Sequence, residues 1–455
     1  MPVVSEPPGI ADVAKGRVDR ATLAANFADL HPPLSPHQAL VEADRCYFCY
    51  DAPCQRACPT AIDVALFVRQ IAAGNPLGAA QTVLEANVMG GMCARACPTE
   101  ALCEGACVRE TAEGRPVRIG LLQRYAVDAQ MATGKTPFSR GAPTGKRVAV
   151  VGAGPAGLAC AHALAVAGHE ATIFEKRDKP GGLNEYGVSA YRATGDFAQR
   201  EAASILSIGG IATQYGVELG REITLDRLRR DYDAVFLALG LGAARRLGLA
   251  GEGALDNVVD AVDYAAELRQ AESLARVPIG RRVVVIGGGM TAMDLAAQAK
   301  RLGAESVTIV YRRGLSQMKA GARQREFAQT NGALIRPWAR PVAIEGHSGA
   351  ASGVLFERTR EDNGELVAAG GAFRLEADLV LLAIGQQGAL DALAGASLRC
   401  DADGRIVVDE QRRASLAGVW AGGDCAAGAR GLIAAAVEDG KRAARSIDAA
   451  LRARA

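Results

Sequence analysis

The sequence predicts an α/β protein in which a small, helical, cysteine-rich domain precedes two nucleotide-binding domains, one inserted in the other. Three observations predict this fold. Eight of the 11 cysteines fall between residues 46 and 107. Two glycine-rich motifs begin at Gly152 and Gly287. After residue 146, apolar runs of strand length alternate with helical stretches, as in parallel sheets covered by helices.

Composition is typical of a globular protein and sets few further limits. At roughly 150 residues per domain, a chain of 455 residues is expected to form about three domains. The chain is 49% hydrophobic and 22% charged, and its net charge of +2 gives no reason to expect a nucleic-acid partner. The first twenty residues lack the apolar core of a signal peptide, and no apolar stretch approaches the ~20 residues needed to cross a bilayer. We therefore expect a cytoplasmic protein without a membrane partner.

The cysteines form two closely spaced groups. The first is a C-x2-C-x4-C-x3-C-P run from Cys46 to Pro59, and the second comprises Cys93, Cys97, Cys103 and Cys107. A [4Fe–4S] cluster takes three thiolates from one tight loop and a fourth from elsewhere, and in two-cluster ferredoxins the cysteine before proline ligates the other cluster. The pattern therefore predicts that Cys58 crosses to the second cluster, and Cys107 could cross back to the first.

Two other uses of the cysteines are less consistent with their spacing. Structural zinc sites are commonly built from paired C-x2-C knuckles, and only Cys46 and Cys49 have that spacing. Disulfides need an oxidising compartment, for which no secretory signal argues. Iron–sulfur ligation is therefore favoured, and two clusters in one small domain indicate transfer of single electrons.

The segments around these cysteines have helical patterns. A short helix is expected at 36–44, two helices at 61–88 separated by a Gly-Asn-Pro break at 74–76, and an amphipathic helix at 115–132. A linker rich in glycine, proline and threonine at 134–145 closes this domain.

The first glycine-rich motif lies in a complete dinucleotide-binding context. Gly152-Ala153-Gly154-Pro155-Ala156-Gly157 follows an apolar run at 148–151 and opens an apolar helix at 158–167. A second strand at 171–174 then ends in Glu175. A glycine-rich turn without a ligand would not need this whole unit, so we interpret it as a nucleotide site.

Each glycine has a distinct role in such a site. Gly152 permits the tight turn, Gly154 lets the backbone approach a pyrophosphate, and Gly157 lets helix and strand pack closely. The helix N-terminus supplies N–H groups to the phosphates. Glu175 is expected to accept hydrogen bonds from an adenosine ribose.

A second copy of the unit begins at Gly287. Gly287-Gly288-Gly289-Met290-Thr291-Ala292 follows a strand and opens a helix, and a further strand is expected at 306–311. Val310 occupies the position equivalent to Glu175, and Arg312 and Arg313 follow it. Arginine at this strand end suits a 2′-phosphate better than a free 2′-hydroxyl. The alternative is that these arginines only solvate the end of a strand.

Three further glycine-containing motifs indicate how the two copies are connected. Ala238-Leu-Gly240 and Ala383-Ile384-Gly385 each end an apolar strand and mark where the chain crosses between nucleotide domains. Near the end, Gly418–Asp424 finishes another strand, and the carboxylate of Asp424 could bond a flavin ribityl chain. A helix from about Leu432 would direct its N-terminus at the isoalloxazine. The predicted domains are 1–140 (helical Fe–S), 141–243 with 388–455 (FAD) and 244–387 (NAD(P)H).

Together these residues resemble one family over roughly residues 36–445. A twin-cluster domain joined to a glutathione-reductase-like FAD/NAD(P)H module occurs in dihydropyrimidine dehydrogenase and in the glutamate synthase small subunit. The spacing from Cys97-Pro98 through Cys103 and Cys107 to Gln123 resembles the former, since the latter is shorter between its equivalents of Cys97 and Cys103. Its motifs and their spacing most resemble those of the FAD/Fe–S subunit of the bacterial two-subunit dihydropyrimidine dehydrogenase.

The resemblance implies specific site residues. One cluster would be held by Cys46, Cys49, Cys54 and Cys107, and the other by Cys58, Cys97, Cys103 and Gln123. FAD contacts would come from Gly152, Ala153, Gly154, Pro155, Ala156, Gly157, Glu175, Lys176, Gly182, Leu183, Arg192, Gly423, Asp424, Leu432 and Ile433. Nicotinamide-nucleotide contacts would come from Gly287, Gly288, Gly289, Met290, Thr291, Arg312, Arg313, Lys319, Ala383, Ile384 and Gly385.

Two positions depart from or complicate this assignment. Cys93 matches a cysteine that the family leaves unligated, although the count of cysteines alone would select it as a ligand. The family's Ile-Pro-Gln-Phe-Arg before the FAD arginine is Val188-Ser-Ala-Tyr-Arg192 here, which puts the packing of this loop on the flavin in doubt.

The resemblance implies an electron-entry subunit with FAD and two [4Fe–4S] clusters. NADPH, or NADH, would give a hydride to FAD, and single electrons would pass through the clusters to an FMN/Fe–S catalytic subunit that reduces uracil or thymine, in a heterotetramer. Hydride transfer needs no acid–base side chain, so no catalytic residue is expected. Three alternatives stay open: the glutamate synthase small subunit, a general NAD(P)H:acceptor oxidoreductase, and an assembly module with vestigial nucleotide sites. A thioredoxin-reductase-like dithiol is not expected, because Cys160, Cys400 and Cys425 lack a C-x-x-C partner.

Overall fold

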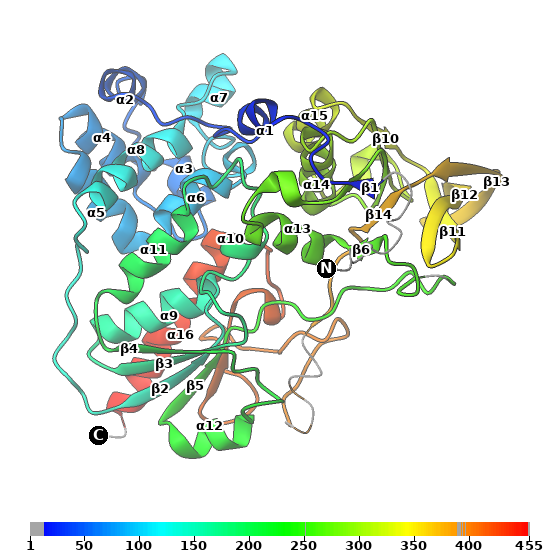
Figure 1. Ribbon diagram of the computed structural model, residues 1–455. Helices are drawn as coiled ribbons and strands as arrows, with labels where there is room; N and C mark the ends of the chain where they lie inside the picture. The colour runs from blue at the N-terminus through cyan, green and yellow to red at the C-terminus, as the bar shows by residue number, and fades with distance from the viewer. Residues whose placement is uncertain (1–12, 251, 389–392, 394, 396, 454–455) are drawn as a thin grey trace, which may run out of the picture. The chain divides into compact units, whose positions relative to one another are not determined.

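The computed structural model describes residues 13–250, 252–388, 393, 395 and 397–453. It falls into two compact units (Figure 1). The larger comprises Asp29–Val188, Arg192–Ala243 and the described part of Gln387–Ala455, and the smaller comprises Ser189–Tyr191, Ala244–Gln386 and the described part of Met1–Ala28. The three domain boundaries drawn from the sequence stay a prediction.

The cysteine-bearing part of the larger unit is helical, as predicted. Its helices are α2 (Pro36–Ala43), α3 (Pro53–Ala57), α4 (Val64–Ala72), α5 (Pro76–Ala86), α6 (Gly90–Ala96), α7 (Val108–Glu113) and α8 (Ile119–Ala132), with a 3-10 turn η1 (Thr99–Ala101). The predicted break between α4 and α5 is confirmed: the Asn75 side chain accepts a hydrogen bond from Gly78 N, and Pro76 occupies the first helical position. Buried apolar residues of α4, α5 and α8, among them Phe67 and Leu122, form the core between these helices.

The rest of the larger unit is a five-stranded parallel sheet in the order β15-β5-β2-β3-β4. The strands are β2 (Arg147–Val151), β3 (Glu170–Glu175), β4 (Ile211–Tyr215), β5 (Ala234–Leu237) and β15 (Val419–Ala421). The helices are α9 (Pro155–Val166), α10 (Leu183–Tyr186), α11 (Phe197–Leu206), α12 (Leu225–Asp231) and α16 (Ile433–Arg452), with a 3-10 turn η5 (Gly423–Cys425). Parallel strands end at one edge of the sheet, which is where such folds bind nucleotides.

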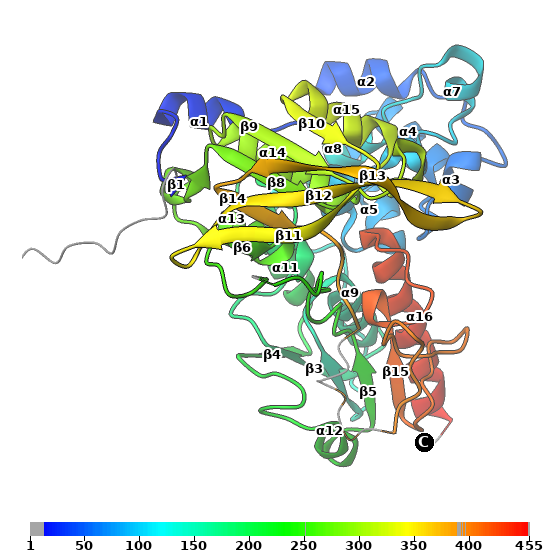
Figure 2. The same cartoon turned by 90° about the vertical axis from the view of Figure 1, so that its right-hand side faces the viewer.

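Helices α9 and α16 lie side by side on this sheet (Figures 1 and 2). Their close approach depends on Gly440 in α16, where a Cβ atom would stand 2.2 Å from the carbonyl oxygen of Ala156 in α9. The last helix of the chain therefore supports the helix that follows the first glycine-rich turn.

The smaller unit contains a second five-stranded parallel sheet, in the order β10-β9-β8-β14-β6. Its strands are β6 (Val258–Asp260), β8 (Arg282–Ile286), β9 (Ser306–Val310), β10 (Ala333–Arg336) and β14 (Leu379–Leu382). Its helices are α13 (Ala261–Gln270), α14 (Met290–Arg301) and α15 (Ala322–Thr330), with 3-10 turns η2 (Leu274–Arg276) and η3 (Leu315–Gln317). An antiparallel sheet of β11 (Ala339–His347), β12 (Ala350–Asp362) and β13 (Glu365–Glu376) is inserted before β14 (Figure 2).

The N-terminal segment from residue 13 to residue 28 belongs to this smaller unit. Strand β1 (Val13–Ala14) pairs with β7 (Ile279–Gly280), and helix α1 (Arg20–Asn26) follows. The Asn26 side chain donates a hydrogen bond of 2.8 Å to the carbonyl of Arg301 at the end of α14. Among the described residues, no helix combines the length and the apolar character needed to cross a membrane.

Candidate redox centres and nucleotide sites

Four cysteines surround one pocket at the start of the helical domain. Cys46 and Cys49 lie in the loop after α2, Cys54 lies in α3 and Cys107 caps α7. All four line a single pocket together with apolar residues of α4 and of the segment before α8. The structure thus brings together the four residues predicted to ligate one cluster, although Cys107 is distant from the other three in sequence.

The thiols of this group lie close enough to shift the pKa values of one another. The pKa of Cys54 is raised to about 12, mainly by burial and then by the neighbouring Cys107 and Cys46. Burial also raises the pKa of Cys46, against a backbone N–H of Phe48 that lies 3.4 Å from its sulfur. Thiolates so placed need a cationic group for compensation, and coordination by metal deprotonates a thiol outright. The pocket therefore fits an iron–sulfur cluster.

A second group of thiols lies where α3, α6 and η1 end. Cys58 follows α3, Cys97 follows α6 and Cys103 follows η1. Burial raises the pKa of Cys97 to about 12, and the nearby Cys58 is the next cause. Burial also raises the pKa of Cys103, followed by the nearby Glu104, Cys97 and Cys58. Among the described residues, no group of three or more His, Cys, Asp or Glu is placed to hold a single metal ion.

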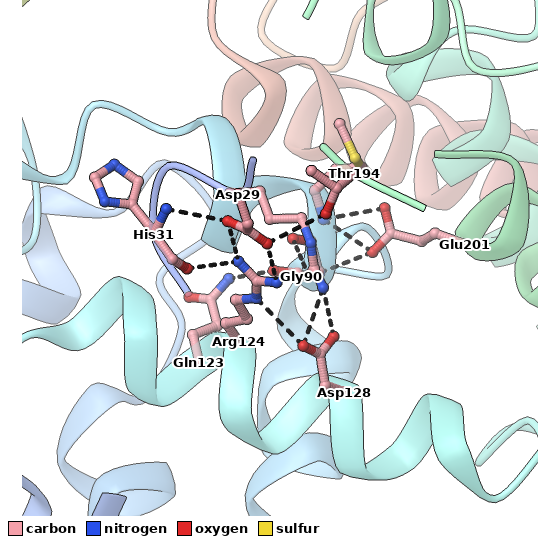
Figure 3. A network of polar contacts seen from close by, with 11 residues as sticks. Asp29, His31, Gly90, Gln123, Arg124, Asp128, Thr194 and Glu201 are labelled. Carbon is pink, nitrogen blue, oxygen red and sulfur yellow. Dashed lines mark hydrogen bonds and ion pairs between the residues drawn. The ribbon is translucent and has the colours of Figure 1, made fainter. Parts of the chain in front are cut away.

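Gln123, on α8, contacts the start of α6, the helix that leads into Cys97. Its side chain is 7% exposed, and its amide nitrogen donates a hydrogen bond of 2.6 Å to the carbonyl of Gly90, the first residue of α6 (Figure 3). The bond directs the amide nitrogen away from iron ligation and leaves the carbonyl oxygen as the ligating atom. Gln123 therefore fits the ligand role that the resemblance implies.

Cys93 has a different environment within the same group. It lies inside α6, is 4% exposed and accepts a hydrogen bond of 3.1 Å from the side-chain nitrogen of Asn87. Burial, followed by the nearby Cys97, raises its pKa well above the usual range. A neutral, buried, hydrogen-bonded thiol is what an unligated cysteine would show, which favours Gln123 over Cys93 as the eighth ligand.

A network of ion pairs that no sequence motif predicts lies beside Gln123. Its sequence neighbour Arg124 pairs with Asp29 at 2.6 Å and with Asp128 at 3.3 Å, and Arg95 of α6 pairs with Asp128 at 2.7 Å (Figure 3). Arg95 and Arg124 are buried. Two of the three pairs join residues distant in sequence, by 33 positions for Arg95 and Asp128 and by 95 for Arg124 and Asp29, so no local motif predicts them. The network fixes α8 against α6 beside the second group of thiols.

The first glycine-rich turn has the predicted geometry. Gly152 has φ +105°, and a Cβ atom there would stand 2.3 Å from the carbonyl oxygen of Ala238. A Cβ atom on Gly157 would stand 1.9 Å from the carbonyl oxygen of Gly152, whereas one on Gly154 would meet only Gly182 Cα, at 3.8 Å. The space beside Gly154 is therefore available to a pyrophosphate.

The other predicted FAD contacts surround this turn or lie close to it in the same unit. Glu175 is 7% exposed and accepts a hydrogen bond from Ala153 N at 2.7 Å. Lys176 is exposed and lies 3.7 Å from Glu218, Gly182 packs against Gly154, and Leu183 at the start of α10 is 46% exposed. An apolar side chain so exposed at the turn is available to a bound nucleotide.

The residues after β15 complete the candidate FAD site. Gly423 has φ +72°, and its N–H donates to the buried carboxylate of Asp439, which also pairs with Arg412. Burial raises the pKa of Asp424, against the opposing effect of Arg405. Leu432 caps α16 and Ile433 begins it, and both are half-buried. Asp439 was not among the predicted site residues, because it lies 16 positions beyond Gly423 in an otherwise ordinary helix.

Tyr191 belongs to the loop at residues 188–192, whose sequence differs from that of the family. Its side chain is fully buried in the smaller unit, where its ring lies 6.1 Å from that of Phe27 and 5.7 Å from that of Phe327. Its hydroxyl lies 3.3 Å from Asp294 in α14. Arg192 itself is half-buried in the larger unit.

The second glycine-rich turn repeats the first. Gly287 has φ +149°, and a Cβ atom there would stand 2.1 Å from the carbonyl oxygen of Ala383, while nothing lies within 4 Å of one on Gly289. Met290, at the start of α14, is 40% exposed, so an apolar side chain again flanks the open space. The other predicted contacts at this turn are Gly288, Thr291, Ile384 and Gly385.

The strand end differs between the two turns. A Cβ atom on Gly288 would stand 2.5 Å from the ring of Tyr311, so this ring lies over the second turn. Arg312 and Lys319 are exposed, and Arg313 is half-buried. The structure thus brings a positive strand end beside the second turn, where the first turn has the carboxylate of Glu175.

Comparison with known proteins assigns the family. Residues 23–135 match the dihydropyrimidine dehydrogenase domain II 4Fe-4S family, and residues 146–440 match the pyridine nucleotide-disulphide oxidoreductase family. The chain is 35% identical to the NAD-dependent dihydropyrimidine dehydrogenase subunit PreT of Salmonella typhimurium, over 93% of this chain and 97% of that one. This chain belongs to the family of these dihydropyrimidine dehydrogenase subunits.

The glutamate synthase [NADPH] small chain of Escherichia coli is also related, at 34% identity over 92% of this chain and 93% of that one. Among solved structures, thioredoxin reductase of T. acidophilum has a TM-score of 0.53, 22% identity and coverage of 68% of this chain and 99% of that one. Mycobacterium tuberculosis FprA with NADPH has a TM-score of 0.56, 18% identity and coverage of 68% and 85%. These structures establish the fold alone.

Membership of the family confirms the predicted fold class and cofactor classes. The chain is an NAD(P)H-dependent flavin and iron–sulfur oxidoreductase with a [4Fe–4S] domain ahead of two Rossmann-like domains. The individual ligands, and the number of clusters, stay proposals.

Proposed function

We propose that this chain is the electron-entry subunit of a dihydropyrimidine dehydrogenase, which oxidises NADPH or NADH and delivers the electrons to an FMN-containing partner subunit that reduces uracil or thymine. The observation that carries the proposal is the presence of two thiol groups and two dinucleotide turns in a chain 35% identical to such subunits over 97% of their length. The dihydropyrimidine dehydrogenase domain II match to the cysteine-bearing part supports it.

The residues that would hold the redox groups are those of the two thiol groups and the first turn. When bound, FAD accepts a hydride as an electron pair, and iron–sulfur clusters carry electrons singly. Cys46, Cys49, Cys54 and Cys107 would hold one cluster, and Cys58, Cys97, Cys103 and Gln123 the other. Glu175 and the space beside Gly154 would receive the adenosine and pyrophosphate of FAD.

The second turn would bind the nicotinamide nucleotide. The open space at Gly289 would accept its pyrophosphate, and Arg312, Arg313 and Lys319 would contact its adenosine end. The protein's contribution to hydride transfer is orientation and electrostatics, so we assign no acid–base residue.

The partner would be the FMN/Fe–S catalytic subunit, in a heterotetramer. We place the chain in the cytoplasm, because all 11 of its cysteines are free thiols, as in a reducing compartment.

The test is reconstitution of the isolated chain. We expect about eight irons per chain, from two cubane clusters, and reduction of artificial dyes by NADPH or NADH without any partner. Uracil or thymine should be reduced only after addition of an FMN-containing subunit. Pyrimidine reduction by the isolated chain, or zinc in place of iron, would contradict the proposal.

A second candidate function rests on a specific relative. The 34% identity to the E. coli glutamate synthase small chain favours delivery of electrons to a glutamate synthase large subunit. The six-residue separation of Cys97 and Cys103 argues for the first function. Identification of the polypeptide that co-purifies with the chain distinguishes the two.

A further inference from the structure

Glu201 is a buried glutamate that binds the first turn of the helix leading to Cys97. It lies on α11, is 2% exposed, and its Oε1 accepts hydrogen bonds from the N–H groups of Gly91 at 2.7 Å and Met92 at 3.1 Å (Figure 3). Its Oε2 lies 3.2 Å from the Met92 nitrogen. Both carboxylate oxygens are therefore directed at the start of α6.

The same turn of α6 is also bound by Gln123. The Gln123 amide donates to Gly90 O at 2.6 Å, one residue before the N–H groups that Glu201 accepts. At its other end α6 leads directly into Cys97, whose N–H bonds to the carbonyl of Cys93 at 3.0 Å. One short helix thus joins the Glu201 contact to two proposed ligands of the second cluster.

The contact between α11 and α6 is closely packed as well as polar. A Cβ atom on Gly91 would stand 2.4 Å from the ring of Phe197, so α6 has no room to shift towards α11. The guanidinium of Arg95 lies 3.4 Å from the centre of the same ring. Phe197 and Glu201 are four positions apart on one face of α11, and together they hold the first turn and the middle of α6.

We propose that Glu201 is a positioning residue for the second cluster: its carboxylate fixes α6, and with it Cys97 and Gln123, and its buried negative charge opposes the electron that the cluster takes up. The charge effect follows because reduction adds one negative charge to a cluster, and charges interact strongly where water is excluded. The inference rests on the two-cluster assignment under Proposed function.

The test is a redox titration of each cluster in the isolated full chain, followed by EPR. Glu201→Gln keeps the size of the side chain and removes its charge, and Cys97→Ala identifies the signal of the second cluster. Above about pH 8, where the carboxylate is ionised, we expect Glu201→Gln to make the midpoint of the second cluster more positive and to leave the first unchanged. Glu201→Ala should lower the iron content from about eight to about four per chain.

The matched control is Glu42→Gln. Glu42 is equally buried, at 2% exposed, and its carboxylate accepts hydrogen bonds from Arg45 and Arg118 beside the first thiol group. This variant should leave the midpoint of the second cluster unchanged.

Two results would overturn the inference: an unchanged second midpoint in Glu201→Gln, or equal shifts of both midpoints. If Glu201→Ala does not fold, the Gln variant decides. A wild-type chain without two clusters would instead contradict the proposed function, so the two failures are distinguishable.

Discussion

The carboxylate of Glu175 accepts a hydrogen bond of 2.7 Å from the backbone N–H of Ala153, inside the first glycine-rich turn. Its other oxygen accepts from Arg177 N at 2.9 Å. The end of β3 and the phosphate-binding turn are thus held together by one side chain, and each oxygen keeps a lone pair for a further donor. Glu175 therefore fits two roles, shaping the turn and binding a ribose.

Removal of this carboxylate should weaken FAD binding. Hydrogen bonds to a charged group contribute about 1.5–3 kcal/mol, so Glu175→Ala should raise the Kd for FAD about ten- to a hundredfold. Rebinding of FAD to the flavin-free protein measures this Kd. Glu175→Gln keeps one acceptor oxygen and should lose less. Wild-type affinity in the Ala variant would show that Glu175 does not contact the nucleotide.

Two glycines of the same turn should respond differently to a methyl group. Gly154→Ala has room within the protein, since the nearest atom is 3.8 Å away, but it fills the space assigned to the pyrophosphate. We expect an unchanged Tm without FAD and loss of FAD binding. Gly157→Ala would place its Cβ 1.9 Å from Gly152 O, and such overpacking costs about 1–3 kcal/mol, which lowers the Tm itself. Equal behaviour of the two variants would contradict these separate roles.

The sequence predicted the nucleotide turns well because their requirements are local. Gly152 packs against the carbonyl of Ala238, and Gly287 packs in the same way against that of Ala383. The turn glycines therefore pack against the first residue of each Ala-x-Gly motif. Strands β5 and β14, which precede the two motifs, pair with β2 and β8, which precede the two glycine-rich turns. The motif recurs because the same contact is made in both units.

The features that were not predicted depend on contacts distant in sequence. Glu201 lies 110 positions from Gly91, and Arg124 lies 95 positions from Asp29. Neither belongs to a spaced motif, and a lone glutamate in an amphipathic helix is expected to face water. The pairing of β1 with β7 likewise joins two-residue strands that have no pattern of their own. The burial of these groups depends on partners that only the folded chain brings close, so it cannot be predicted from the local sequence.

Glu201 should also make stability depend on pH. Burial raises the pKa of Glu201 to about 7, against the lowering effect of the Met92 and Gly91 N–H groups. Because the folded pKa exceeds the unfolded one, wild-type stability relative to Glu201→Gln should be greatest below about pH 4.5 and fall as pH rises through about 7, by a few kcal/mol in all. The difference in Tm between the two proteins, measured from about pH 5.5 to 8, tests this. A difference that grows with pH would refute it.

Alanine variants should identify the eighth cluster ligand. If Gln123 ligates iron through its carbonyl oxygen, Gln123→Ala should change the EPR signal of the second cluster and shift its midpoint. Cys93→Ala should then keep about eight irons per chain and the wild-type signal, because the Cys93 thiol bonds to Asn87 instead. Loss of about four irons in Cys93→Ala would assign the ligand to Cys93.

Arg312 should decide which nucleotide the second turn prefers. The related subunits differ in this respect, since PreT of S. typhimurium is NAD-dependent and the E. coli glutamate synthase small chain uses NADPH. The strand register aligns Tyr311, and not Val310 as the residue count predicts, with Glu175 of the first unit. The position of the carboxylate that would repel a 2′-phosphate is therefore occupied by a tyrosine. Arg312 and Lys319 are exposed, and within the described residues no ion pair engages their side chains. Both are therefore available to a phosphate.

We expect the wild type to prefer NADPH, and Arg312→Ala to lose about ten- to a hundredfold in kcat/KM for NADPH, as a charge-assisted contact of about 1.5–3 kcal/mol implies. The kcat/KM for NADH should change little. The matched control is Arg276→Ala, which removes an arginine that is 74% exposed and already paired with Glu272. An equal loss for both nucleotides would show that Arg312 binds a group they share, and a wild-type preference for NADH would defeat the assignment.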